Sequence, residues 1–256
     1  MQSGKPLSGK TVFAAVLLCV LVPGLVLLGS LVWANRQYYL VSTLVIVLSL
    51  LPLLVRFERR APQARELVLL SVMTALAVAG RAAFGFAPAF KPVAAIVILT
   101  GAAFGCEAGF LVGAATAVVS NFFFGQGPWT PWQMMGFGLI GFLAGVVFAR
   151  RYQPSRPALC VFGFFAVFCL YGPLLDVGSV LMVAGEVSRE TILAALATGV
   201  AFNAIHAGAT VLFLALIGQP LLKKLDRVKV KYGLMEEAFV GENANTNEEL
   251  GIRNEE

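Results

Sequence analysis

The sequence predicts an all-α integral membrane protein, and its composition and apolar runs are the two observations behind that prediction. Of the 256 residues, 59% are hydrophobic and 13% are charged, and the mean hydropathy is +0.84. A soluble domain of this size has no core large enough to bury so much apolar surface. The apolar runs are long and lack the two-residue alternation of a membrane barrel, so we expect the spans to be helices.

Eight apolar segments are long enough to predict membrane spans. The first two form an N-terminal hairpin with a very short connection. The fourth is marginal in length and contains Pro88 and Pro92, and the seventh is expected to bend near Gly172 and Pro173. The eight segments are residues 11–33, 38–55, 66–83, about 86–104, 107–123, 132–148, 158–184 and 191–217.

These segments divide the chain into three parts. Residues 1–60 are predicted to form the extra transmembrane hairpin, for which the sequence indicates no function. Residues 61–225 are predicted to form a six-helix bundle that holds the substrate site. Residues 226–256 make an acidic tail, which we expect to be disordered because it is acidic and its last stretch lacks aromatic residues. A short interfacial helix is possible near 223–235.

Orientation follows from the distribution of Lys and Arg. With the N-terminus in the cytoplasm, nearly all basic residues flank the cytoplasmic ends of the spans, and only Arg36, Lys91 and Arg189 lie outside. Both termini are therefore predicted to be cytoplasmic, in a multi-pass protein of a bacterial-type cell membrane. This topology accounts for the net charge of +5, so we predict no nucleic-acid partner.

The turn between the fifth and sixth predicted spans, residues 121–133, has an unusual composition. Its thirteen positions contain two Trp, three Phe, two Gln, two Pro and an Asn. A rigid, aromatic and polar segment is typical of the mouth of a small-molecule site, although an interfacial aromatic belt would also account for the Trp and Phe. The candidate ligand contacts in it are Asn121, Gln126, Trp129, Trp132 and Gln133.

Four further polar residues lie within apolar runs. Arg81 is near the outer end of the third span, Asp176 is in the seventh, and Asn203 and His206 share one face of the last. A carboxylate, an amide and an imidazole in a helical bundle predict a polar pocket. Two alternatives stay open, namely that Arg81 extends to the headgroups and that the other three form a structural hydrogen-bond set.

The sequence predicts no enzyme, metal site or cofactor. The four cysteines lie in or beside apolar runs without metal-ligand spacing, and one His with one Asp falls short of a coordination shell. No nucleophile and base are placed together. Residues 4–11 match a phosphate-loop pattern, but no strand can precede them and a membrane span follows, so we interpret the match as chance.

Small residues recur every four positions in the third span, at Ser71, Ala75 and Ala79. Such a stripe lets another helix approach closely.

With these features, residues 66 to about 222 resemble the substrate-binding S component of an energy-coupling factor (ECF) vitamin transporter. The resemblance rests on six compact spans, on Ala75 and Ala79, and on the block from Glu107 to Gln133. It implies capture of a micronutrient outside the cell by a subunit without its own motor. It also implies docking through the stripe at Ser71, Ala75 and Ala79 onto a transmembrane coupling subunit that carries two ATPase subunits.

Among the substrates of that family, a corrinoid of the cobalamin type is our first expectation, because the predicted mouth is aromatic and has few charges. A flavin, a queuosine precursor or another heterocycle stays open. Two other classes also stay open, a stand-alone secondary transporter or channel for a small organic solute and a membrane scaffold.

Overall fold

The computed structural model describes residues 64–148, 154–183 and 188–232, and helices account for almost all of these residues. The predicted hairpin at 1–60 lies outside the described residues, as does the tail beyond 232. The elements, in chain order, are α4 (Ala64–Ala83), α5 (Val93–Phe104), α6 (Cys106–Phe124), α7 (Thr130–Phe148), α8 (Arg156–Phe165), the π-helix η2 (Ala166–Tyr171), α9 (Gly172–Val183) and α10 (Arg189–Tyr232).

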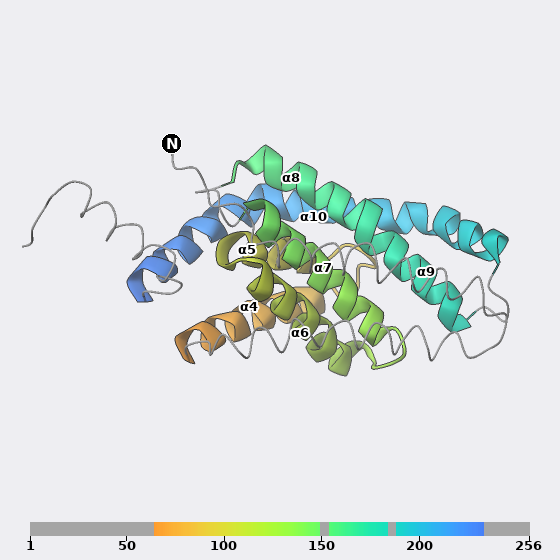
Figure 1. Cartoon of the computed structure of the whole chain (residues 1–256), viewed down its shortest axis with the longest axis horizontal. Helices are drawn as coiled ribbons and strands as arrows, with labels where there is room; N and C mark the ends of the chain where they lie inside the picture. The colour runs from red at the N-terminus through yellow and green to blue at the C-terminus, as the bar shows by residue number, and fades with distance from the viewer. Residues whose placement is uncertain (1–63, 149–153, 184–187, 233–256) are drawn as a thin grey trace, which may run out of the picture.

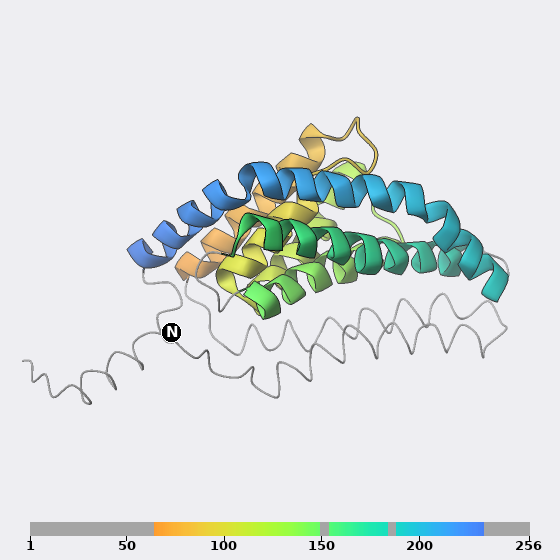
Figure 2. The same ribbon diagram turned by 90° about the horizontal axis from the view of Figure 1, so that it is seen from above.

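Helix α10 organises the molecule. It extends along the whole long axis in Figures 1 and 2, with α8 and α9 beside it. Helices α4, α5, α6 and α7 form a second group, in which α7 packs on both α5 and α6, and α5 contacts α10. Helix α7 also packs on η2 and α9, and these contacts connect the second group to the first.

Five of the described helical segments are long and apolar enough to cross a membrane, and α5 is a shorter apolar helix. They coincide with the last six of the eight predicted spans, so the all-α, membrane-spanning prediction is confirmed for this part of the chain. The first two predicted spans and the positions of both termini lie outside the described residues.

Helix α5 begins at Val93, later than the predicted start near residue 86. Its 12 residues span about 18 Å, which is less than the hydrocarbon core of a bilayer. Pro88 and Pro92 explain the late start, because each lacks an N–H and disfavours helix in the residue before it. Ala89, between them, has a φ of 61°, which a helix does not permit.

The seventh predicted span is continuous but irregular. The structure shows a π-helical turn directly before Gly172, whose N–H bonds the carbonyl of Val167, five residues back. Pro173 has no N–H to offer the carbonyl of Cys169, and a π-turn is a common way to accommodate such a break. The predicted irregularity is therefore present as a π-turn between α8 and α9.

Helix α10 continues to Tyr232, well past the predicted end at 217, and contains Pro220. Its extension is held by tertiary contacts: Leu222 and Leu225 are buried, and the Lys229 ammonium donates to the Ala103 carbonyl and lies 5.7 Å from the Phe104 ring. The basic segment that was expected as a separate interfacial helix is thus part of α10 as far as residue 232.

Helices α5, α6 and α7 pack backbone against backbone through glycines. A Cβ at Gly101, Gly109 or Gly145 would lie closer than 3.0 Å to the backbone of a facing helix or turn, and one at Gly141 would meet Gly109 in the same way. Side chains at these positions would force the helices apart. Gly101 and Gly109 are eight residues apart and Gly141 and Gly145 are four apart, and together these glycines form the contact between the three helices.

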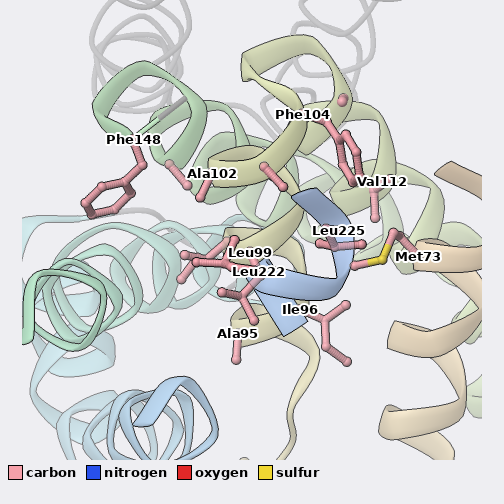
Figure 3. Packing of buried hydrophobic residues seen from close by; sticks show 14 of the residues in the cluster. Met73, Ala95, Ile96, Leu99, Ala102, Phe104, Val112, Phe148, Leu222 and Leu225 are labelled. Atoms are coloured by element: carbon pink, nitrogen blue, oxygen red, sulfur yellow. The ribbon is translucent and has the colours of Figure 1, made fainter. Parts of the chain in front are cut away.

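Figure 3 shows the largest hydrophobic cluster, in which Met73 of α4, Leu99 of α5, Val112 of α6 and Leu225 of α10 converge. Phe148 at the end of α7 belongs to the same cluster. The cluster joins the two helix groups.

Candidate functional site

A hydrogen-bond network joins α4, α6 and α7. Arg81 donates from Nη1 to Ser120 Oγ and to Asn121 Oδ1, the latter at 2.9 Å. The Asn121 amide in turn donates to Thr130 Oγ1 and to Gln133 Oε1, both at 2.9 Å. Asn121 is buried and uses its oxygen and both amide hydrogens within the protein, so it holds Arg81 and Gln133 in position.

The turn from α6 to α7 is ordered by the same network. The Thr130 hydroxyl donates to Gln126 Oε1 at 2.9 Å, and Gln126 Nε2 donates to the Val118 carbonyl at 2.8 Å. Gly125 has a φ of 97°, which favours glycine, and its carbonyl accepts from Trp129 Nε1 at 3.3 Å. Gln126 and Trp129 are exposed, so this turn presents an amide and an indole face at one end of the bundle.

A second polar group lies between α9 and α10. Asn203 donates from Nδ2 to Asp176 Oδ2 at 2.7 Å, and Asn203 is buried while Asp176 is half-buried. A Cβ at Gly172 would clash with Asn203, and one at Gly199 would clash with Asp176. The carboxylate and the amide therefore fill spaces that the two glycines leave open.

His206 lies in an aromatic setting one helical turn beyond Asn203. Its ring is edge-on to Tyr171 with a centroid distance of 5.1 Å, and Phe137 lies 4.5 Å from Tyr171 and 6.5 Å from His206. No hydrogen bond between described residues joins this aromatic group to the Arg81 network.

Two cations share one aromatic ring at the C-terminal ends of α4 and α6. The Arg81 Cζ lies 4.9 Å from the Phe124 centroid, and the Lys91 Nζ lies 5.4 Å from it. Burial lowers the pKa of Lys91 from its ordinary value, and the positive charge of Arg81 lowers it further. This spot is electropositive and partly shielded from solvent.

Trp132 occupies a different environment from the rest of its segment. It is 1% exposed and packs among Phe110, Met135 and Leu174, with Gly178 of α9 against its ring. Its indole N–H is buried and has no acceptor among the described residues. Its role as a ligand contact stays a prediction, and the indole also fills the core between α7 and α9.

The structure thus gathers the predicted site residues into groups. Arg81, Asn121, Gln126 and Gln133 share one network, and Asp176 pairs with Asn203. The residues that complete these groups were not among the predicted site residues. Ser120, Phe124 and Thr130 all lie within the block from Glu107 to Gln133 that the sequence singled out. Lys91 and Tyr171 lie outside that block.

The predicted docking stripe lies on the outer surface of α4. Ser71, Ala75 and Ala79 are all exposed, while Met73 and Ala77 on the opposite side are buried in the core. The Ser71 hydroxyl donates to the Leu67 carbonyl at 2.8 Å, so it needs no external partner. The stripe is a smooth face of small side chains.

Within the described ranges, no three His, Cys, Asp or Glu residues are grouped in a way that would hold a metal ion. In the same part of the chain, Cys160 and Cys169 form no disulfide.

Comparison with known proteins gives two matches. Residues 62–227 match the model of the family described as ECF-type riboflavin transporter, S component. A UPF0397 protein from Vibrio atlanticus (strain LGP32) is 30% identical over 174 residues, which cover 63% of this chain and 91% of the relative. No solved structure matches the chain significantly. Because the family match extends over more than half of the chain, from α4 almost to the end of α10, the chain belongs to the family of ECF-type riboflavin transporter S components and is a multi-pass protein of the cell membrane.

Proposed function

We propose that this chain is the substrate-binding subunit of an ECF-type transporter and that it captures a vitamin-type micronutrient for uptake into the cell. The observation that carries the proposal is the family match, which covers all described helices that bear the candidate site. Uptake would be driven by partners, a transmembrane coupling subunit and two ATPase subunits.

A flavin-type heterocycle is the first ligand to test. The family description names riboflavin, and neither comparison supports the corrinoid that the sequence led us to expect. A flat ring system would suit the exposed Trp129 indole, and the polar edge of such a ring would find amide and carboxylate groups in the bundle. A corrinoid is therefore the competing ligand in the experiments.

The ligand contacts that we propose are made by polar atoms that are not already used in hydrogen bonds within the protein. Asn121 is committed to its neighbours, so we assign it the role of positioning Arg81 and Gln133, which have nitrogen atoms outside its hydrogen bonds. Asp176 is only half-buried, and the second oxygen of its carboxylate is not used by Asn203. We propose that these residues, with His206, line the ligand site, while Gln126 and Trp129 lie at its mouth.

For docking we propose the face of α4 that carries Ser71, Ala75 and Ala79. Its exposure and its small side chains support this role, since a partner helix could approach the α4 backbone closely there.

The first experiment is absorbance and mass spectrometry of whatever copurifies with the detergent-solubilised full chain. A flavin at near-equal stoichiometry would support the proposal and name the ligand, and a bound corrinoid would support capture while rejecting the flavin assignment. A protein that arrives empty and binds neither riboflavin nor cobalamin in equilibrium titrations would contradict both assignments.

The second experiment tests dependence on a motor. Proteoliposomes with this chain alone should bind the ligand but show no sustained uptake, while those that also contain the coupling subunit and both ATPase subunits should accumulate ligand when supplied with ATP. Sustained uptake by the chain alone, driven by an ion gradient, would instead identify a stand-alone secondary transporter.

A further inference from the structure

We propose that Arg81 and Lys91, held against the Phe124 ring, form an oxyanion-binding site that takes a carboxylate or phosphate group. The inference goes beyond the proposed function, because such a site binds its anion whether that group belongs to a transported molecule or to a phospholipid.

The first supporting observation is that three separate segments build this spot. Arg81 comes from the last turn of α4, Lys91 from the connection to α5, and Phe124 from the end of α6. Both cationic centres lie within 5.4 Å of the Phe124 centroid, and Gly85 lies against the edge of that ring. Contact with a ring face attracts a cation, but a ring carries no net charge with which to neutralise two of them.

The second observation is the lack of a negative partner. Arg81 bonds only to the neutral side chains of Ser120 and Asn121, and neither Arg81 nor Lys91 forms an ion pair with any residue in the described ranges. Both are half-buried, and they repel each other, as the effect of Arg81 on the Lys91 pKa indicates. Two adjacent cations removed from water cost free energy unless an anion compensates them.

The third observation is that Arg81 is oriented and still has donors available. Its two hydrogen bonds both come from Nη1, which leaves Nε and Nη2 without a described partner, and neither of these atoms is buried. A guanidinium held in this way presents a planar pair of donors, which matches two oxygens of a carboxylate or phosphate. Lys91 adds a second charge and immediately precedes the N-terminal end of α5, where partial positive charge also favours an anion.

The test uses phenyl phosphate as the probe and benzyl alcohol as its neutral counterpart. Binding to the full chain in a non-ionic detergent is followed by saturation-transfer NMR, with the thermal unfolding midpoint as a check on folding. We expect phenyl phosphate to bind and benzyl alcohol to bind at least tenfold more weakly.

Charge-removing variants locate the site. Arg81→Gln and Lys91→Gln should each weaken phenyl phosphate binding by roughly tenfold, as expected for loss of a charge-assisted hydrogen bond. Lys91→Arg should retain phenyl phosphate binding. Arg189→Gln removes an exposed charge elsewhere and should leave that binding unchanged. Lys91→Gln remains informative if Arg81→Gln does not fold, because Lys91 makes no hydrogen bond to a described residue.

A further arm identifies the source of the anion. Native mass spectrometry of the chain released from phospholipid nanodiscs should show a retained phospholipid that phenyl phosphate displaces, if a lipid headgroup occupies the site. Retention of a soluble phosphate or carboxylate compound, with no phospholipid, would assign the site to a transported molecule. Equal binding of both probes, or phenyl phosphate binding that is unchanged in folded Lys91→Gln and Arg81→Gln, would overturn the proposal.

Discussion

Asn203 on α10 donates to Asp176 on α9 at 2.7 Å, and each of these side chains lies over a glycine of the opposite helix. Gly172 precedes Asp176 by four residues and makes room for Asn203, while Gly199 precedes Asn203 by four residues and makes room for Asp176. The arrangement is reciprocal. It places a carboxylate and an amide at the contact of two helices without separating them.

Asp176→Ala is expected to weaken ligand binding and to lower the free energy of unfolding by about 1–3 kcal/mol, because the buried Asn203 amide loses its acceptor. The ligand dissociation constant and the thermal unfolding curve, both in detergent, measure the two effects.

Asp176→Asn is the matched control, because it keeps an oxygen that can accept from Asn203 but removes the charge. It should unfold close to the wild-type temperature. Unchanged ligand affinity in both variants would remove Asp176 from the proposed site.

Gly199→Ala and Gly208→Ala form a pair on the same helix. A Cβ at position 199 would clash with the Asp176 carboxylate, whereas a Cβ at 208 has no neighbour within 4 Å. We expect Gly199→Ala to destabilise the chain by about 1–3 kcal/mol through overpacking, and Gly208→Ala to be neutral or up to about 1 kcal/mol stabilising. The thermal unfolding midpoints of the two variants check this expectation. Equal shifts of the midpoint would argue against close packing of the Asp176 carboxylate on Gly199.

Trp132→Phe separates packing from hydrogen bonding at the buried indole. The substitution keeps an aromatic ring and removes an N–H that has no acceptor among the described residues, so the loss of stability should come from the smaller ring volume and be less than that of Trp132→Ala. If the indole donates to the bound ligand, affinity should fall several-fold, in line with about 0.5–1.5 kcal/mol for one hydrogen bond.

Trp132→Ala, by contrast, should cost about 3–5 kcal/mol through the cavity it leaves. Ligand titration of folded Trp132→Phe tests whether the indole N–H donates to the ligand. An affinity equal to that of the wild type would mean that Trp132 only packs in the core.

Ala75→Trp should prevent recovery of the assembled transporter while sparing ligand binding, because a large side chain on the exposed small-residue face blocks helix approach. The measurement is co-purification of the coupling subunit with the tagged variant, alongside a ligand titration. Val161→Trp, at an exposed position of α8, controls for added bulk at the lipid-facing surface. Full assembly by Ala75→Trp would place the docking face elsewhere.

Much of the fold could be predicted because membrane helices follow from local apolar length. The boundaries of α4, α6 and α7 agree with the predicted segments to within two residues. The prediction was wrong where tertiary contacts outweigh local signals. Helix α10 passes through Pro220 because Leu222 and Leu225 are buried beyond it. The late start of α5 has a local cause instead, in Pro88 and Pro92.

The candidate site shows the same division. The residue types in the block 121–133 and the polar residues within apolar runs were visible without a structure, and so was the membrane class, because each depends on composition over a short stretch. Which side chains meet was not visible. Arg81 reaches Asn121 across 40 positions, and Asn203 reaches Asp176 across 27, so both pairings depend on how the helices pack. The second pairing also needs the space left by Gly172 and Gly199. Packing of this kind is a property of several helices at once, and no single segment encodes it.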